Sequence, residues 1–262
     1  MINEEKFNKW FGLFIMVGMS IAVCSVTAFK LGASQDGKAL LLLSAFASLM
    51  GVVGTVTSAV GKVYTYFFSF FDVLIYGIVC IINWKHGGAG LGNGLLHLAY
   101  FVPMQFVGFF QWKKRETTGG TVRPRRLTAK QRWLSAGVVL LLSLVVYVIL
   151  AKFDKSAADS FIKMAVVLDT IPVVCNIIGQ FLMSTAYMEQ WIFWIGVNIA
   201  SILMWTASFR HTGDSFTLVY IIKYCFYFLN CCNGLRIWLR LSDPNLKTQE
   251  YFLTLVESGS ES

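Results

Sequence analysis

The chain has 262 residues, of which 56% are hydrophobic and 14% are charged, and its mean hydropathy is +0.63. Soluble globular proteins carry about 25% charged residues, so a charge content this low indicates that much of the surface faces lipid. Basic residues (22) exceed acidic ones (14), but many of them lie in one short stretch between apolar segments, which argues against nucleic acid as a partner. The predicted class is an all-α integral membrane protein in a lipid bilayer.

A transmembrane helix needs about 20 apolar residues. Eight segments meet or approach this length, at about 11–31, 39–60, 63–84, 93–112, 133–152, 160–187, 190–207 and 216–239. The apolar runs are continuous and lack the period-two alternation of strands. The first has no signal-peptide cleavage site, so we expect it to be a helix. The sixth contains Pro172, where we expect a kink or a break.

The basic stretch gives an orientation. It follows the fourth span and holds eight basic residues and one acidic residue, Glu116; the basic residues are Lys113, Lys114, Arg115, Arg123, Arg125, Arg126, Lys130 and Arg132. Loops rich in Lys and Arg stay in the cytoplasm. With four spans on each side of this loop, both termini are predicted to be cytoplasmic as well.

Comparing the chain with itself at a shift of 126 residues indicates an internal repeat. A GxxxW pattern ends both the fourth and the eighth span, with Gly108 and Trp112 matching Gly234 and Trp238. The same shift places Asp72 on Asn198. Spans two to four then repeat as spans six to eight in the same orientation, as two parallel three-helix bundles joined by a linker helix. The predicted divisions are an extra N-terminal helix (1–38), a first bundle (39–112), a basic loop and linker helix (113–159), a second bundle (160–241) and a polar cytoplasmic tail (242–262).

Asp72 is the most costly residue within a span. An acid at the centre of a transmembrane helix costs about 2.5–3.5 kcal/mol on insertion scales. We therefore expect a cavity, a cationic partner or a bound proton beside it. A purely structural ion pair or a protonated carboxyl is an equally good interpretation.

The seventh span carries Trp191, Trp194 and Asn198 at positions i, i+3 and i+7, on one helical face. Two indole rings and a carboxamide suit a planar heterocycle, especially a cationic one. For Trp191 the alternative is an aromatic belt residue at the membrane interface.

Other polar residues lie within the spans. Asn176 and Gln180 belong to a four-residue stripe in the sixth span, which could be a seam between helices or the wall of a pathway. Gln105 lies in the fourth span and Asn230 in the eighth. Lys223 lies near an outer end, so we expect it to be solvated.

Metal and catalytic chemistry have little support in the sequence. The six cysteines fall in apolar segments without a CxxC pattern, and no histidine stands at metal-ligand spacing, so neither a metal nor a cofactor is expected. HExxH, GxSxG and Walker A motifs are absent, which argues against an enzyme and against a chain that itself drives transport with ATP.

Two stretches, YFVPMQFVGFFQWKK (100–114) and EQWIFWIGVNIASILMW (189–205), resemble the PnuC-type nicotinamide riboside transporters. That family shows a PxQxxGxxxW-like run in one half and a WxxWxxxN run in the other, and the resemblance covers about residues 40–241. It implies a fold similar to the SWEET sugar transporters. It also implies facilitated diffusion of nicotinamide riboside across the bacterial inner membrane, with trapping by phosphorylation in the cytoplasm.

The resemblance also implies site residues. Trp191, Trp194 and Asn198 match the WxxWxxxN run, and Gln105 matches the amide of the PxQ run. These four residues would bind the substrate between the bundles. Our own additions to the substrate site, made from the residues alone, are Asp72, Asn176, Gln180 and Asn230.

Several alternatives stay open. Thiamine is another cationic heterocycle that the same chemistry would bind, and a sugar is less suited to two tryptophans. A non-transporting scaffold or sensor has no need for polar side chains at one depth in four spans, and a membrane-embedded enzyme lacks a recognisable nucleophile or metal set. The first span could serve as a subunit contact in a homo-oligomer.

Overall fold

The structure, a computed structural model, describes residues 4–33, 38–85, 91–153, 160–212 and 215–243. The named elements within these ranges are all helices, and α4, η1 and α5 follow one another as one continuous run. This gives eight helical runs in the described residues and confirms the all-α prediction. Their bounds are α1 (Glu4–Ala33), α2 (Lys38–Ala59), α3 (Thr65–Lys85), α4 (Leu91–Leu96), η1 (His97–Phe101), α5 (Val102–Lys113), α6 (Ala129–Phe153), α7 (Ser160–Ser184), α8 (Gln190–Thr212) and α9 (Ser215–Leu241).

Proline affects two of these helices differently. The π-helical turn η1 ends two residues before Pro103, which lies in the first turn of α5. Proline has no N–H to donate to the carbonyl four residues earlier, so the helix is irregular at this point. In contrast, α7 continues through Pro172 as one helix. The expected break at Pro172 is therefore wrong, and the irregular turn lies in the fourth span instead.

Several helices are apolar enough for a membrane. In the described part of the chain, Lys6–Gly32, Leu41–Ala59 and Ala129–Ile149 are long and apolar enough to cross a bilayer by length and composition. Thr65–Val79, Thr170–Ser184 and Gln190–Leu203 are shorter apolar stretches. The membrane-facing character is clearest in α6, where no residue of the apolar window is buried.

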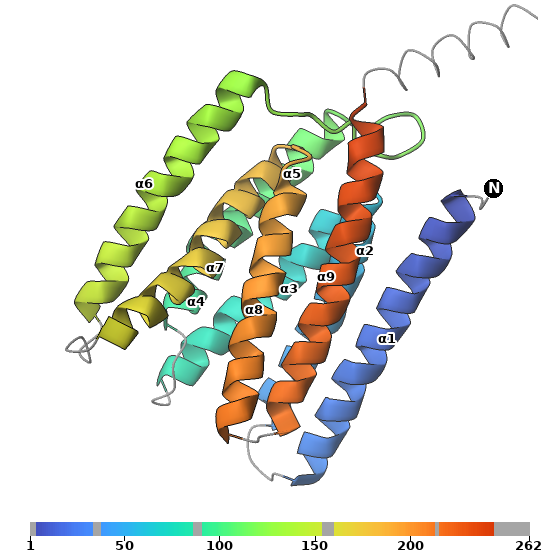
Figure 1. Cartoon of the computed structure of the whole chain (residues 1–262). Coiled ribbons are helices and arrows are strands. Elements are labelled where there is room, and N and C mark those ends of the chain that lie inside the picture. Colours follow the sequence, from blue (N-terminus) through green and yellow to red (C-terminus); the bar gives the residue numbers. More distant parts are fainter. Residues whose placement is uncertain (1–3, 34–37, 86–90, 154–159, 213–214, 244–262) are drawn as a thin grey trace, which may run out of the picture.

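The helices group as two sets of three with the same contact pattern (Figure 1). In the first set α3 packs against α2 and α5, and in the second set α8 packs against α7 and α9. Two contacts join the sets, α5 with α7 and α2 with α9. If α2, α3 and α5 correspond to α7, α8 and α9, each of these contacts has its counterpart, as a two-fold repeat requires.

The remaining helices flank the two bundles. The linker helix α6 packs on α7, and the extra helix α1 packs on α2 and α9. Ile15 and Met19 of α1 are buried with Val52 and Val56 of α2, which fixes α1 along the first bundle.

The start of α1, the loop 114–128 and the end of α9 lie at one end of the molecule, which we call the basic-loop end (Figure 1). Arg126 of this loop donates hydrogen bonds to Ser242 Oγ (2.8 Å) and to the carbonyl of Leu239 (2.6 Å). Arg236 of α9 forms an ion pair with Glu4 of α1 (3.2 Å). This shared end agrees with the predicted topology; most of the predicted polar tail, 244–262, lies outside the described residues.

Candidate functional site between the two bundles

The turn between α2 and α3 has the same geometry as the turn between α7 and α8. Gly61 has φ +70° and Ala186 has φ +60°, 125 residues apart. In the first turn the Lys62 N–H donates to the carbonyl of Thr57 (3.0 Å), and in the second the Tyr187 N–H donates to the carbonyl of Leu182 (2.8 Å). The turns and the helices that follow them are thus related by 125 residues rather than 126.

This register corrects one prediction. At a shift of 125 residues Asp72 corresponds to Val197, and Asn198 corresponds to Val73, so Asp72 and Asn198 are not symmetry mates. The shift of 126 holds for α5 and α9, as the tryptophan contacts described below show. One additional residue between the start of α8 and the end of α9 accounts for the difference.

A chain of hydrogen bonds joins α7 to α5 across the interface between the bundles. Gln180 donates through Nε2 to Ser184 Oγ (3.1 Å), and Ser184 Oγ donates to the carbonyl of Met104 (3.0 Å). The next residue on α5, Gln105, is 3% exposed and donates to the carbonyl of Phe101 (3.2 Å), whereas its Oε1 finds no partner among the described residues. An unsatisfied buried acceptor costs about 1–3 kcal/mol, so Gln105 Oε1 is well suited to accept a hydrogen bond from a ligand.

Asn198 lies on α8 where it faces α9. Its side chain is buried, and Nδ2 is shared between the carbonyl of Trp194 (2.8 Å) and Cys231 Sγ (3.2 Å). The Trp194 ring is only half-buried, and its edge lies over Gly179 of α7, where an added Cβ would approach to 3.3 Å. Trp194 and Asn198 therefore form a partly open aromatic surface beside a buried amide.

Two further predicted residues lie at helix contacts. Asn230 of α9 is buried and donates to the carbonyl of Thr55 on α2 (3.1 Å), which joins the two bundles. Asn176 is half-buried on α7, one turn before Gln180. The stripe on α7 is thus a seam between helices where Gln180 and Ser184 lie.

Trp191 occupies a different environment from Trp194. It is 2% exposed, and its ring covers Gly234 of α9 so closely that an added Cβ would lie 2.7 Å away. Its ring centroid is 6.0 Å from that of Trp238. In this structure Trp191 packs in the protein interior, whereas the predicted alternative placed it in an aromatic belt facing the membrane interface.

Four aromatic residues, Tyr66, Trp112, Trp191 and Trp238, form a buried cluster that we call the aromatic cluster. The centroids of Trp112 and Trp238 are 5.3 Å apart, and Tyr66 meets Trp112 edge to face at 5.0 Å. Tyr66 also covers Gly108, as Trp191 covers Gly234. The GxxxW pattern thus has a physical reason, because each glycine leaves room for an aromatic ring from the neighbouring helix.

The two tryptophans of the pattern make equivalent hydrogen bonds across the interface. Trp112 of α5 donates through Nε1 to the carbonyl of Met183 on α7 (2.7 Å), and Trp238 of α9 donates to the carbonyl of Ser58 on α2 (3.3 Å). Met183 and Ser58 are again 125 residues apart. Each bond has a net worth of roughly 0.5–1.5 kcal/mol, which is small enough to be broken during a conformational change.

Asp72 has a cationic neighbour. Its carboxylate lies against Gly51 of α2, where an added Cβ would be 2.5 Å from Oδ2. Lys223 of α9 attracts this carboxylate electrostatically. The Lys223 ammonium also lies 5.4 Å from the ring centroid of Tyr227. Lys223 is half-buried rather than fully solvated. Of the three compensations expected for Asp72, a nearby cation is the one that this attraction favours.

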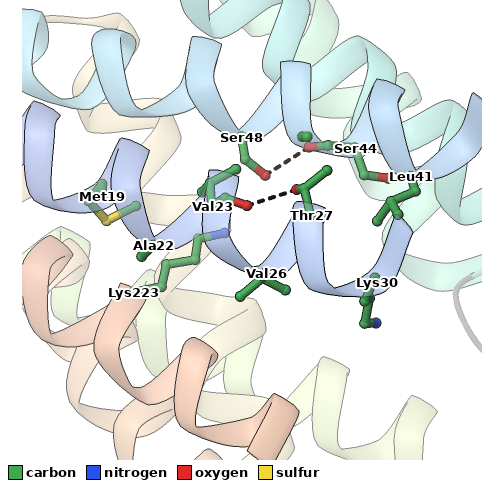
Figure 2. A pocket seen from close by; sticks show the side chains of 11 residues that line it. Met19, Ala22, Val23, Val26, Thr27, Lys30, Leu41, Ser44, Ser48 and Lys223 are labelled. Atoms are coloured by element: carbon green, nitrogen blue, oxygen red, sulfur yellow. Dashed lines mark hydrogen bonds between the residues drawn. The ribbon is translucent and has the colours of Figure 1, made fainter. Parts of the chain in front are cut away.

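Lys223 also borders a cavity of about 230 Å³ between α1, α2 and α9 (Figure 2). Thr27 and Ser48 in its wall donate their hydroxyl protons to the carbonyls of Val23 and Ser44, both at 2.8 Å. None of the eight predicted binding residues lines this cavity. It lies toward the end away from the basic loop, because Lys30 and Leu41 at the adjoining ends of α1 and α2 both contribute to it.

Sequence reasoning missed three contributors to this region, Ser184, Tyr66 and Lys223. Ser184 was visible only as part of a polar stripe. Tyr66 could have been found from the repeat, because it corresponds to Trp191 at a shift of 125. Nothing in the sequence alone indicates that Lys223 lies near Asp72, because the two residues belong to different bundles.

The comparisons with known proteins agree with this architecture. The family model described as the nicotinamide mononucleotide transporter matches residues 41–240. The chain belongs to this transporter family. The match spans both bundles and the linker helix and leaves out α1.

Named members of the family are similar over most of their length. A nicotinamide riboside transporter PnuC from Neisseria mucosa is 30% identical over 203 residues, covering 76% of this chain and 72% of the relative. The protein of the same name from Haemophilus influenzae is 28% identical over 202 residues, covering 76% and 80%. A solved structure titled "Crystal structure of the Vitamin B3 transporter PnuC" has a TM-score of 0.63 and 27% identity, with 90% of this chain and 91% of the other covered. The family membership confirms the expected resemblance and the expectation of a membrane transporter rather than an enzyme.

Proposed function

We propose that this chain transports nicotinamide riboside by facilitated diffusion, with the substrate bound between the two bundles. The observation that carries the proposal is the buried, unpartnered Oε1 of Gln105 at the interface of the bundles. The family resemblance implies that this same side chain, Gln105, binds the substrate. Trp194 and Asn198 supply the aromatic surface and the amide that the resemblance assigns to the same site.

The chemistry of nicotinamide riboside fits these groups. Its pyridinium ring is flat and positively charged, and an indole face attracts a desolvated cation by up to about 2 kcal/mol. Its carboxamide N–H and ribose hydroxyls can donate to amide oxygens such as Gln105 Oε1. Asp72 could offset the charge of the ligand. Asn176, Gln180 and Asn230 complete the polar lining in this proposal.

The orientation and the mode of transport also belong to the proposal. The basic loop would face the cytoplasm of a bacterial cell, with both termini on the same side of the inner membrane. Phosphorylation in the cytoplasm would trap the imported nucleoside. Uphill accumulation of nicotinamide riboside in liposomes without a phosphorylating enzyme would contradict uncoupled transport. A homo-oligomer stays a prediction, which light scattering of the detergent-solubilised protein would test.

The experiment is calorimetric titration of the detergent-purified protein with nicotinamide riboside, nicotinamide mononucleotide and thiamine. We expect the riboside to bind, Trp194→Ala to weaken this binding, and Trp133→Ala to leave it unchanged, because Trp133 on α6 is 81% exposed. Binding of the mononucleotide or of thiamine alone would keep the site and change the substrate. If none of the three binds, the proposed transport of this vitamin class is wrong, and a scaffold or sensor becomes the better interpretation.

A further inference from the structure

We propose that Trp112 and Trp238 form the gate that closes the transport pathway at the basic-loop end of the molecule. The inference rests on the proposed function, because it gives these residues a role in the movement of the same substrate. It follows from the way in which the two hydrogen bonds cross between the bundles.

The two indole rings lie out of reach of solvent in this structure. Trp112 and Trp238 are both 0% exposed, and their rings contact each other where α5 and α9 end. Gln105 lies two turns from Trp112 on α5, and Asn230 lies two turns from Trp238 on α9. A substrate held between these amides would have to pass the two indole rings to leave at the basic-loop end.

The contacts separate into those within a bundle and those between bundles. Tyr66 over Gly108 joins α3 to α5, and Trp191 over Gly234 joins α8 to α9, so both hold a bundle together. The Trp112 and Trp238 hydrogen bonds instead reach the opposite bundle, and the Tyr66 hydroxyl shares the Met183 carbonyl with Trp112 (3.2 Å). Each bundle could therefore move as a unit while only the contacts between bundles break, as in transporters built from repeats.

The acceptors suit a contact that opens and closes. The carbonyls of Ser58 and Met183 lie in the last turns of α2 and α7, and each also accepts a backbone hydrogen bond from the turn that follows, from the Gly61 N–H (3.0 Å) and the Ala186 N–H (2.9 Å). Water can replace the indole donors when the helices separate, so opening leaves no carbonyl permanently unsatisfied. Because a two-fold repeat relates the two bonds, both should break together.

Cys231 provides a native reporter for the test. It is buried in the same cluster, two turns from Trp238 on α9, and an opened gate would expose it to the basic-loop end. The protein would keep Cys231, with the other five cysteines replaced by serine. It would be reconstituted in liposomes, and a charged, membrane-impermeant methanethiosulfonate reagent would be added on the side of the basic loop.

Trp112→Phe and Trp238→Phe each remove the indole donor and keep an aromatic ring. We expect each to raise the rate of Cys231 modification by about three- to tenfold, the factor that one hydrogen bond represents. Trp133→Phe on the exposed surface of α6 is the matched control and should not change the rate. If a phenylalanine variant does not purify as a monodisperse species, leucine at the same position also lacks a donor and gives the same test.

Equal rates in wild type and in both variants would overturn the gate. The result is separate from the substrate assignment, because modification of Cys231 is measured without substrate. A protein that fails to bind nicotinamide riboside but shows faster modification in both variants would have the gate and a different cargo. A protein that transports nicotinamide riboside with unchanged modification would keep the function and lose the gate.

Discussion

Gly61 and Ala186 adopt the same left-handed backbone conformation at equivalent turns of the two bundles. Glycine accepts this conformation freely, whereas alanine incurs a cost of about 1–2 kcal/mol. Ala186 is completely buried in the same hydrophobic core as the aromatic cluster. Burial of its methyl group stabilises the fold by about 0.8 kcal/mol. The second turn therefore retains alanine at little net cost.

The first prediction concerns these two turns. Gly61→Ala should destabilise the protein by about 1–2 kcal/mol, because it forces a Cβ into the left-handed region. Ala186→Gly should be close to neutral, because relief of the backbone offsets loss of the buried methyl group. Thermal unfolding of the detergent-purified variants measures both. If Gly61→Ala is no more destabilising than Ala186→Gly, the left-handed angle does not determine the stability of these turns.

The second prediction concerns the glycines under the aromatic rings. Gly108→Ala would place a Cβ 2.2 Å from the ring of Tyr66, and Gly234→Ala would place one 2.7 Å from Trp191. Overpacking of this kind costs about 1–3 kcal/mol, so both variants should unfold at a lower temperature than wild type. Gly137→Ala on α6 has nothing within 4 Å and should be neutral or slightly stabilising. If Gly137→Ala instead lowers the unfolding temperature, the higher helix propensity of alanine does not determine the stability of α6 at this position.

The third prediction separates the two tryptophans of α8. Trp191→Ala removes a buried ring and should lower stability by about 3–5 kcal/mol, the usual cost of a large cavity. Trp194→Ala removes a half-buried ring and should weaken nicotinamide riboside binding with little change in unfolding temperature. Calorimetry and thermal unfolding of both variants give the comparison. The assignment of Trp194 to the ligand is wrong if the two variants lose binding and stability in the same proportion.

The fourth prediction concerns the charge beside Gly51. Asp72→Asn should weaken binding of nicotinamide riboside about fivefold, as loss of roughly 1 kcal/mol of attraction to a cation implies. Lys223→Gln should strengthen it by a similar factor, because Lys223 competes for the same carboxylate. The neutral dihydro form of the riboside is the control ligand, and its affinity should not respond to either change. An unchanged affinity of Asp72→Asn for the cationic form removes Asp72 from the site.

The helices could be predicted from the sequence because each span is a long apolar run. The basic loop also allowed the prediction that the start of α1 and the end of α9 lie at the same end of the molecule. The repeat was recognisable from Gly108, Trp112, Gly234 and Trp238, which keep their identity because glycine alone leaves room for the facing ring. The register of Asp72 against Asn198 was wrong by one residue. A shift without gaps cannot show an added residue, whereas backbone angles at Gly61 and Ala186 reveal it.

The candidate site was predictable in part. Gln105 and Asn198 could be singled out because an amide within an apolar span needs a reason. The different surroundings of Trp191 and Trp194 could not be predicted, because both residues stand on one helical face. Only the contact of Trp191 with Gly234 on another helix distinguishes their environments. The proximity of Lys223 to Asp72 depends on contacts between bundles, which leave no periodic signal in a single chain.

The loop that carries the orientation signal also limits movement. Val122 donates its N–H to the carbonyl of Gly61 (2.8 Å), and Arg125 donates to the carbonyl of Ala186 (2.7 Å). Only three peptide units separate Val122 from Arg125, so their Cα atoms cannot lie more than about 11 Å apart. While these bonds hold, the turn of one bundle cannot travel far from the turn of the other. This end of the molecule would then work as a pivot with a fixed span, and any passage there would have to widen where α5 and α9 end.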